Sequence, residues 1–204
     1  MMNSYDNQKN EEVNHSEVQL NELDRDSVES VSDENTSNQN ITVVKIGGST
    51  LGEHDTTLSD LVQLQKEGQN PVVVHGGGKI VSEWMEKQGV KPKFVDGLRV
   101  TDAQSLDIVT SVLTGLINKN LVSSIIKKGG NAVGISGVDG QMISAKITNP
   151  NLGFVGEVTS INSKPIFSAL NSGFIPVIAP VGVNEESSEN EDTNLLNINA
   201  DTVA

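Results

Sequence analysis

The chain contains no cysteine, which excludes disulfide bonds, thiolate metal sites and a cysteine nucleophile. It is also poor in basic residues, since 14 Lys and Arg stand against 27 Asp and Glu. A protein whose main partner is nucleic acid needs a surplus of Lys and Arg for the phosphate backbone, so this partner is not expected. No apolar run approaches the roughly 20 residues that span a bilayer, and the N-terminus lacks the basic and apolar regions of a signal peptide. We therefore expect a soluble cytoplasmic protein with no membrane partner.

The first 40 residues differ in composition from the remainder. They contain no Gly and no Pro, and they carry 10 acidic residues against 2 basic ones. From residue 41 onward the two classes number 17 and 12, and five of those acids fall within residues 185–192, where we expect a solvated loop. A polar tail of this kind buries too little apolar surface to offset the entropy lost on ordering. We predict a disordered acidic tail over residues 1–40 and one domain over residues 41–204.

Short β-branched runs alternate with helical periodicity from residue 41 onward. Strands are predicted at residues 41–46, 72–74, 132–135 and 175–179, and the first of them is predicted to be buried. Helices are predicted between residues 55 and 68, over about 79–88, from Asp102 to the glycines at 129–130, and over 163–170. The runs 141–148 and 155–161 flank turn residues and predict a hairpin. The sequence therefore predicts an α/β protein whose mainly parallel sheet has helices on both faces and an appended β-hairpin.

Two glycine turns, Gly47-Gly48 and His75-Gly76-Gly77-Gly78, each follow a predicted strand directly. Successive glycines let backbone N–H groups approach an anion closely, and a following helix adds its positive end. This pattern favours a phosphate or carboxylate site at the carboxyl edge of the sheet, with tight turns between packed elements as the alternative. The second turn lacks the Ser or Thr of a P-loop after Lys79 and lacks the third Gly of a dinucleotide fingerprint.

Two basic residues lie close to these turns. Lys45 is one residue from the end of an otherwise apolar strand, where its burial is costly unless it faces an anion or reaches out at the sheet edge. The neighbouring glycines favour the anion. Arg99 comes just before the long predicted helix, and its planar fork suits a carboxylate. A surface arginine paired with Asp96 or Asp102 is an equal alternative.

Other polar and bulky residues have plainer interpretations. His75 closes a buried strand and is predicted to be a hydrogen-bonded core residue. Trp84 and Met85 are predicted to be packing residues of the helix after the glycine turn. Near the C-terminus, Asn197 and Asn199 alternate with apolar residues on one predicted strand face, where their polar groups need a ligand or a hydrogen-bond network.

Five ordered motifs together resemble the acetylglutamate kinases of the amino acid kinase family. They are Val44-Lys45-Ile46-Gly47-Gly48, His75-Gly76-Gly77-Gly78, Asp96-Gly97-Leu98-Arg99-Val100-Thr101, Gly153-Phe154-Val155-Gly156-Glu157-Val158 and Asn197-Ile198-Asn199-Ala200-Asp201. The resemblance implies an open three-layer αβα sandwich that phosphorylates the side-chain carboxylate of N-acetyl-L-glutamate in arginine biosynthesis. It also implies ATP with Mg²⁺ bound mainly through the nucleotide phosphates, no metal site on the protein, and a homo-oligomer in the full-length form.

The resemblance also assigns roles to single residues. Lys45 would stabilise charge on the phosphoryl group in flight, and Asp201 would hold the catalytic lysines in place. The residues implied in binding the acceptor are Gly77, Gly78, Arg99 and Asn197, and those implied in binding phosphate are Gly47 and Gly48. We expect this set to converge at the carboxyl edge of the sheet.

The sequence departs from the family in one respect. The family continues beyond the position of Ala204 into a half that supplies the adenine pocket and a second catalytic lysine. Residues 41–204 are therefore expected to be the acceptor half of the kinase domain, and the 204-residue chain alone is expected to be inactive. Two alternatives stay open, a sister kinase acting on carrier-linked aminoadipate and a truncated, non-catalytic protein that binds acylamino acids.

Overall fold

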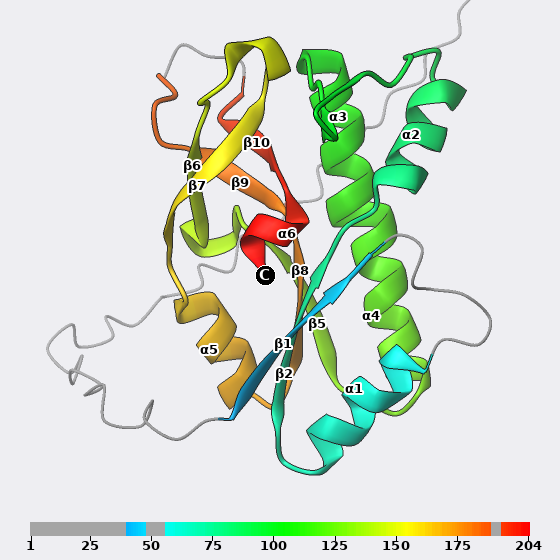
Figure 1. Ribbon diagram of the computed structural model, residues 1–204. Coiled ribbons are helices and arrows are strands. Elements are labelled where there is room, and N and C mark those ends of the chain that lie inside the picture. The colour runs from blue at the N-terminus through cyan, green and yellow to red at the C-terminus, as the bar shows by residue number, and fades with distance from the viewer. Residues whose placement is uncertain (1–39, 48–55, 189–192) are drawn as a thin grey trace, which may run out of the picture. The chain divides into compact units, whose positions relative to one another are not determined.

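Four parallel strands form the central sheet of the computed structural model, which describes residues 40–47, 56–188 and 193–204 (Figure 1). Residues 1–39 of the predicted tail, Gly48 and residues 189–192 of the acidic run lie outside these residues. The spatial order of the strands is β1 (Ile41–Ile46), β2 (Asn70–His75), β8 (Ile175–Ala179) and β5 (Ala132–Ser136). All neighbouring pairs are parallel, as predicted.

Helices cover both faces of this sheet (Figure 1). They are α1 (Thr57–Lys66), α2 (Gly78–Lys87), α3 (Ala103–Thr110), α4 (Asn118–Lys127), α5 (Lys164–Asn171) and the short α6 (Ala200–Val203). Successive side chains of a strand point to opposite faces, so β2 contributes to two cores. Val73 packs with α1 and α4, whereas Val72 and Val74 pack in the core that holds Leu170 of α5. The predicted three-layer αβα arrangement is confirmed.

The predicted hairpin is present, but it is half of a second sheet. Strands β6 (Ile143–Lys146) and β7 (Val155–Ile161) pair antiparallel. Each of them also pairs in parallel with a later strand, β6 with β9 (Val181–Asn184) and β7 with β10 (Leu195–Ile198). Because β9 and β10 pair as well, the four strands close into a small barrel. The description of an appended hairpin was therefore incomplete.

Strand β1 is not the buried strand that its apolar sequence predicted. It lies at the edge of the sheet within the described part of the chain, and β2 is its neighbour there. Ile41 and Val43 are 38% and 49% exposed, and only Ile46 is fully buried. An apolar run indicates that a strand can be covered on both faces, but it does not show which other elements lie beside it.

The long predicted helix begins at Asp102, whose Oδ1 accepts the N–H of Ser105 at 2.9 Å. It continues through α3, the π-helix η2 (Ser111–Ile117) and α4 to Lys127. By length and composition, this run of residues 103–127 could cross a membrane, which is weak evidence by itself. Its most apolar window is 44% buried inside the fold, where α3, η2 and α4 all contribute side chains to the core beside the parallel sheet.

The π-helix changes which side chains of this long helix are buried. Helical periodicity predicts one face made of Leu106, Val109, Leu113, Leu116, Asn120 and Ile125. Four of these residues are buried as predicted, namely Leu106, Val109, Leu113 and Ile125. Leu116 and Asn120 are exposed instead, and Ile117 and Asn118 are buried in their place. A π-helix bonds residue i to i+5, so it rotates the following residues relative to a regular α-helix. The sequence carried no signal for this insertion.

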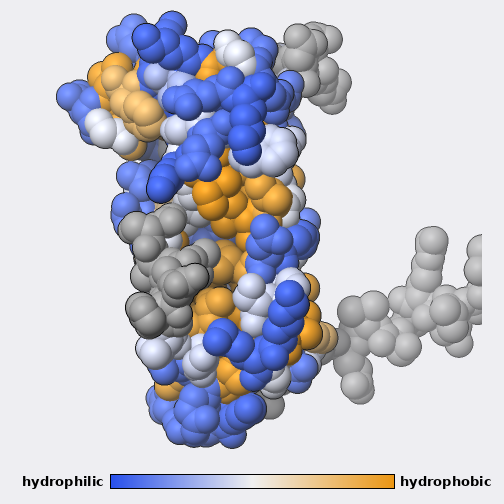
Figure 2. Space-filling view, turned by 90° about the vertical axis from the view of Figure 1, so that its right-hand side faces the viewer, coloured by the Kyte–Doolittle hydropathy of each residue, from blue (hydrophilic) through white to orange (hydrophobic). Residues whose placement is uncertain are grey.

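Apolar side chains are exposed on the helical side of the molecule (Figure 2). A groove of about 330 Å³ lies between α2 and the α3–η2 segment, with Trp84, Ile108, Val112 and Leu116 among its lining residues. Trp84 and Met85 were both predicted to be packing residues, and Met85 is buried, whereas Trp84 is 38% exposed and lines the groove. The two residues are neighbours on α2 and therefore point in different directions from the helix axis.

A tight hairpin and two 3-10 helices complete the fold. The hairpin joins β3 (Phe94–Val95) to β4 (Leu98–Arg99), and the 3-10 helices are η3 (Asp139–Gln141) and η4 (Pro150–Leu152). Asp96 and Gly97 between β3 and β4 have φ values of 50° and 82°. An Asp-Gly pair with positive φ at both positions is typical of a two-residue hairpin turn.

Gly153 occupies a position that tolerates no side chain. Its φ is +70°, and an added Cβ would collide with the carbonyl oxygen of Thr101 and lie 3.0 Å from its carbonyl carbon. The backbone of Thr101 cannot easily retreat, because it bonds to Leu152 O at 2.8 Å and to Phe154 N at 2.7 Å. We expect Gly153→Ala to lower the free energy of unfolding by more than about 2 kcal/mol, measured by urea denaturation.

Gly68→Ala provides the matched control for this prediction. Gly68 has a similar φ of +79°, but nothing lies within 4 Å of its added Cβ. Only the conformational penalty applies there, about 1 to 2 kcal/mol. Equal losses in the two variants would show that the close approach to Thr101 contributes nothing.

Candidate functional site

A cavity of about 310 Å³ opens at the carboxyl edge of the parallel sheet. Its lining includes Lys45 near the end of β1, Gly76 directly after β2 and Pro180 directly after β8. The predicted site residues that line it are Lys45, Gly47, Gly77, Gly78, Arg99, Asn197 and Asp201. This edge is where open α/β sheets bind their ligands, and the volume suits a small molecule. Gly48 lies outside the described residues, and the roles of the others stay predictions.

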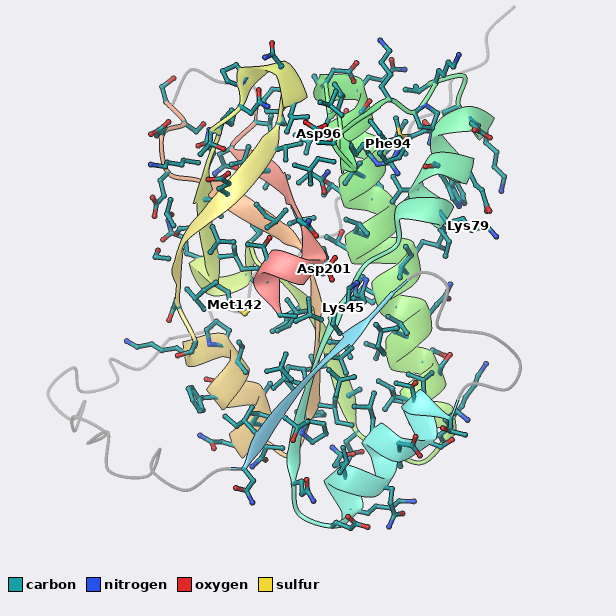
Figure 3. The ribbon with its side chains drawn as sticks, viewed as in Figure 1. Lys45, Lys79, Phe94, Asp96, Met142 and Asp201 are labelled. Atoms are coloured by element: carbon teal, nitrogen blue, oxygen red, sulfur yellow. The ribbon has the colours of Figure 1, made fainter. Side chains whose placement is uncertain are left out.

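Lys45 and Asp201 form an ion pair at the mouth of this cavity (Figure 3). Nζ of Lys45 lies 2.7 Å from the Asp201 carboxylate, and the two side chains are 36% and 70% exposed. Asp201 is in the first turn of α6, where its N–H bonds to Oδ1 of Asn199 at 3.0 Å. Asn199 therefore caps a helix rather than continuing the strand face of Asn197. Exposed pairs contribute little to stability, so what this pair shows is the position of the ammonium beside the carboxylate.

His75 ends β2 as a buried, hydrogen-bonded residue, as predicted. Burial lowers the pKa of the ring, so it is neutral at neutral pH. Nδ1 lies 3.0 Å from Gly76 O and Nε2 lies 3.2 Å from Nδ2 of Asn118. A carbonyl only accepts and an amide nitrogen only donates, so Nδ1 carries the proton and Nε2 accepts. These bonds fix the point at which the strand gives way to the glycine turn.

The glycine turn lies directly on the π-helix. A Cβ on Gly77 would collide with Cδ1 of Ile117 and lie 3.1 Å from Cδ2 of Leu113, so a larger residue would have to displace these two side chains. Gly77 is also the N-cap residue of α2, and Gly78 is its first residue. The free N–H groups at the start of a helix favour an anion. The turn therefore presents backbone donors at the cavity wall.

Arg99 is buried between α2 and the β3–β4 hairpin, with 8% of its surface exposed. Its Nη2 bonds to Gly78 O and Ser82 Oγ, both at 2.8 Å, and Nη1 bonds to Met85 Sδ at 3.1 Å. The guanidinium also lies 4.7 Å from the centre of the Phe94 ring. These contacts fix the guanidinium at the wall of the cavity.

No carboxylate compensates this buried charge among the residues that the structure describes. The alternative of a surface arginine paired with Asp96 or Asp102 is wrong, since neither forms an ion pair with Arg99. Burial lowers the pKa of Arg99, but a guanidinium stays charged at neutral pH. A buried cation without an anionic partner is costly, and an anion in the adjoining cavity would relieve that cost.

Asn197 faces the same cavity from β10. Its backbone N–H bonds to Phe154 O at 2.9 Å, and its side-chain Nδ2 donates to Thr101 Oγ1 at 3.1 Å. Thr101 and Ser82, which contact the predicted site residues, were not singled out from the sequence. Ser82 is one helical turn after Gly78, a spacing that could have suggested contact, whereas nothing local links Thr101 to Asn197.

Apolar side chains form the remaining wall, with Val81, Val109 and Leu113 prominent among them. Across residues 40–47, 56–188 and 193–204, no group of three or more His, Cys, Asp or Glu is placed to hold a metal ion. The cavity therefore combines two cations, an amide, backbone donors and an apolar wall.

Comparison with known proteins gives one consistent result. A sequence profile of the amino acid kinase family matches residues 40–204. The acetylglutamate kinase of Synechocystis sp. is 45% identical over 166 residues, which cover 79% of this chain and 54% of the relative. That of Dehalococcoides mccartyi is 42% identical over 164 residues, which cover 80% and 60%. The chain thus spans little more than half the length of the curated relatives it matches.

Solved structures share the fold. The Streptococcus mutans protein smu.665 superposes with a TM-score of 0.72 at 32% identity, covering 81% of this chain and 66% of its own. An N-acetylglutamate synthase from Neisseria gonorrhoeae, complexed with coenzyme A and N-acetyl-glutamate, gives a TM-score of 0.62 at 19% identity, covering 79% and 37%. At this identity the second likeness concerns the fold alone.

Proposed function

The chain belongs to the amino acid kinase family, and from that premise we propose that it forms the acceptor half of an acetylglutamate kinase. The reaction would transfer a phosphoryl group from ATP to the side-chain carboxylate of N-acetyl-L-glutamate, giving N-acetylglutamyl phosphate in arginine biosynthesis. The observation that carries the proposal is the pairing of a buried, uncompensated Arg99 with an exposed Lys45 on one small cavity. A dicarboxylate places one negative charge near each cation.

The acceptor would bind along the wall that runs from Arg99 to Asn197. Arg99 would take one carboxylate, since a guanidinium forms strong charge-assisted bonds to it. Asn197 would bond the acylamino group with its amide. The methylene chain would lie on the apolar wall near Val109 and Leu113. The other carboxylate would then reach the glycine turn, where it is the nucleophile.

Lys45 would stabilise the negative charge of the phosphoryl group during transfer. Its ammonium is fixed by Asp201 at 2.7 Å, so it needs little reorganisation when that charge develops. Backbone N–H groups of Gly47, Gly77 and Gly78 would bind phosphate or carboxylate oxygens beside it. A carboxylate is already an anion at neutral pH and needs no general base, so positioning and charge stabilisation carry the reaction.

ATP would supply the phosphoryl group and Mg²⁺ would neutralise part of its charge. The residues that line the cavity fit the phosphoryl end of a nucleotide, because Lys45 and the glycine turns offer a cation and backbone donors. The described residues offer no metal-ligand cluster, so Mg²⁺ would be bound mainly through the nucleotide phosphates.

We also propose a cytoplasmic, homo-oligomeric full-length enzyme with no nucleic-acid or membrane partner. The apolar groove between α2 and the α3–η2 segment supports the oligomer, because exposed apolar patches mark contact surfaces (Figure 2). The acidic composition supports the absence of a nucleic-acid partner.

Calorimetric titration separates an acceptor site from a complete kinase. We expect the purified 204-residue chain to bind N-acetyl-L-glutamate and to bind ATP weakly or not at all. A hydroxamate assay should then detect no acyl phosphate. L-Glutamate, which lacks the acyl group, is the matched control and should bind at least about tenfold more weakly, since it leaves a polar group of the site unmatched. Robust turnover by this chain would overturn the assignment of an acceptor half only.

A further inference from the structure

The backbone around Thr101 is fixed on both sides by the segment that enters β7. Thr101 N bonds to Leu152 O at 2.8 Å, and Phe154 N bonds to Thr101 O at 2.7 Å. The next hydrogen bond of the same segment, from Asn197 N to Phe154 O at 2.9 Å, attaches β10. Thr101 and Asn197, which are 96 residues apart, are therefore held on either side of Phe154.

The hydroxyl of Thr101 acts both as a hydrogen-bond donor and as a hydrogen-bond acceptor. Its proton is donated to Arg99 O at 3.1 Å, and its oxygen accepts from Nδ2 of Asn197 at 3.1 Å. A hydroxyl has one proton, so with that proton directed at a carbonyl it can only accept from the amide. The nitrogen end of the Asn197 amide must then face Thr101. Among the described residues, no other group bonds to the amide oxygen or the second N–H of Asn197, so both can bond to a ligand in the cavity.

We infer that Thr101 is a positioning residue, which orients the Asn197 amide for an acylamino ligand. This inference rests on the proposed function and adds a residue to it. Thr101 is 0% exposed and is not among the residues that line the cavity, so it acts through Asn197 and touches no ligand. An acyl amide carries one N–H donor and one carbonyl acceptor. It is the complement of the oxygen and N–H that Thr101 leaves free on Asn197.

Two substitutions at position 101 separate the hydroxyl from the packing. Thr101→Val keeps the shape and removes the hydroxyl, whereas Thr101→Ser keeps the hydroxyl and removes a buried methyl group. Thr110→Val is the matched control, because the Thr110 hydroxyl is buried without a hydrogen-bond partner in the described structure and Thr110 does not line the cavity. Each variant is titrated with N-acetyl-L-glutamate by calorimetry, and its stability is measured by urea denaturation.

We expect Thr101→Val to raise the Kd about three- to tenfold, as for one misplaced hydrogen bond. Thr101→Ser should stay within about twofold of the wild type even though it loses packing, and Thr110→Val should bind as the wild type does. If Thr101 were merely structural, affinity would follow stability in both position-101 variants. Wild-type affinity in Thr101→Val would overturn the inference while leaving the proposed function intact.

A ligand-free measurement keeps the inference testable if the wild type fails to bind acetylglutamate, which would sink the proposed function. In nitrogen-15 spectra of the 204-residue chain, the two Nδ2 protons of Asn197 should exchange with water at different rates, because one is bonded to a buried oxygen. The difference should persist in Thr101→Ser and disappear in Thr101→Val. Equal spectra for the wild type and Thr101→Val would show that the hydroxyl does not orient the amide.

Discussion

Lys45→Ala is expected to lower kcat about 10²- to 10³-fold in a form of the protein extended to the length of its relatives. The ammonium lies at the cavity mouth, fixed by Asp201, and its charge matters most when negative charge builds up on the phosphoryl group in transit. Acceptor affinity should fall far less than kcat, because Arg99 and Asn197 remain. Steady-state kinetics with the hydroxamate assay measures both quantities.

Lys79→Ala is the matched control for this prediction. Lys79 follows the glycine turn directly, but it does not line the cavity and lies on the outer side of α2, away from Lys45 and Asp201 (Figure 3). The substitution Lys79→Ala removes the same charge from a nearby exposed position. We therefore expect kcat to fall by less than about twofold, as for a solvent-screened charge. A similar loss in both variants would mean that the general positive potential, and not the placement of Lys45, accelerates transfer.

The sequence was sufficient for those parts of the fold that local pattern determines. Alternating strands and helices predicted the parallel sheet, and Asp102 marked the start of the long helix correctly. The closed barrel of β6, β7, β9 and β10 was not predictable, because its closing pairs join residues far apart in the chain. The π-helix was missed for a different reason, since hydrophobic periodicity assumes one helical repeat and η2 changes it.

Some residues of the candidate site could likewise be predicted from the local sequence, and others could not. Lys45 and the glycine turns stood out locally, because a lysine near the end of an apolar strand and successive glycines after strands favour an anion site over a purely structural role. The alternatives for Arg99 could only be decided by its surroundings, in which α2 supplies three hydrogen-bond partners and no carboxylate is paired with it. Thr101 was invisible as a site residue because its contact with Asn197 spans 96 positions.

The contacts of Arg99 limit how it can hold a carboxylate. A guanidinium has five N–H donors, and both donors on Nη2 are used by Gly78 O and Ser82 Oγ. A two-pronged contact with a carboxylate needs one N–H of Nη2, whichever edge of the fork it uses. One of these partners must therefore give way. Ser82 is the one that can, because its hydroxyl already donates to Gly78 O at 2.9 Å and keeps that bond after Arg99 leaves.

Arg99→Lys is therefore expected to weaken N-acetyl-L-glutamate binding about 10- to 100-fold, the equivalent of about 1.5 to 3 kcal/mol for a charged hydrogen bond. The charge remains, but the fork and its fixed orientation are lost. Calorimetry on the 204-residue chain gives the Kd, and the extended form should show a higher KM for acetylglutamate with little change for ATP. Ser82→Ala keeps the guanidinium and removes its competing partner, so its Kd should equal or fall below that of the wild type. An Arg99→Lys variant that kept its acetylglutamate affinity and lost only ATP affinity would show that the two halves of the site are assigned the wrong way round.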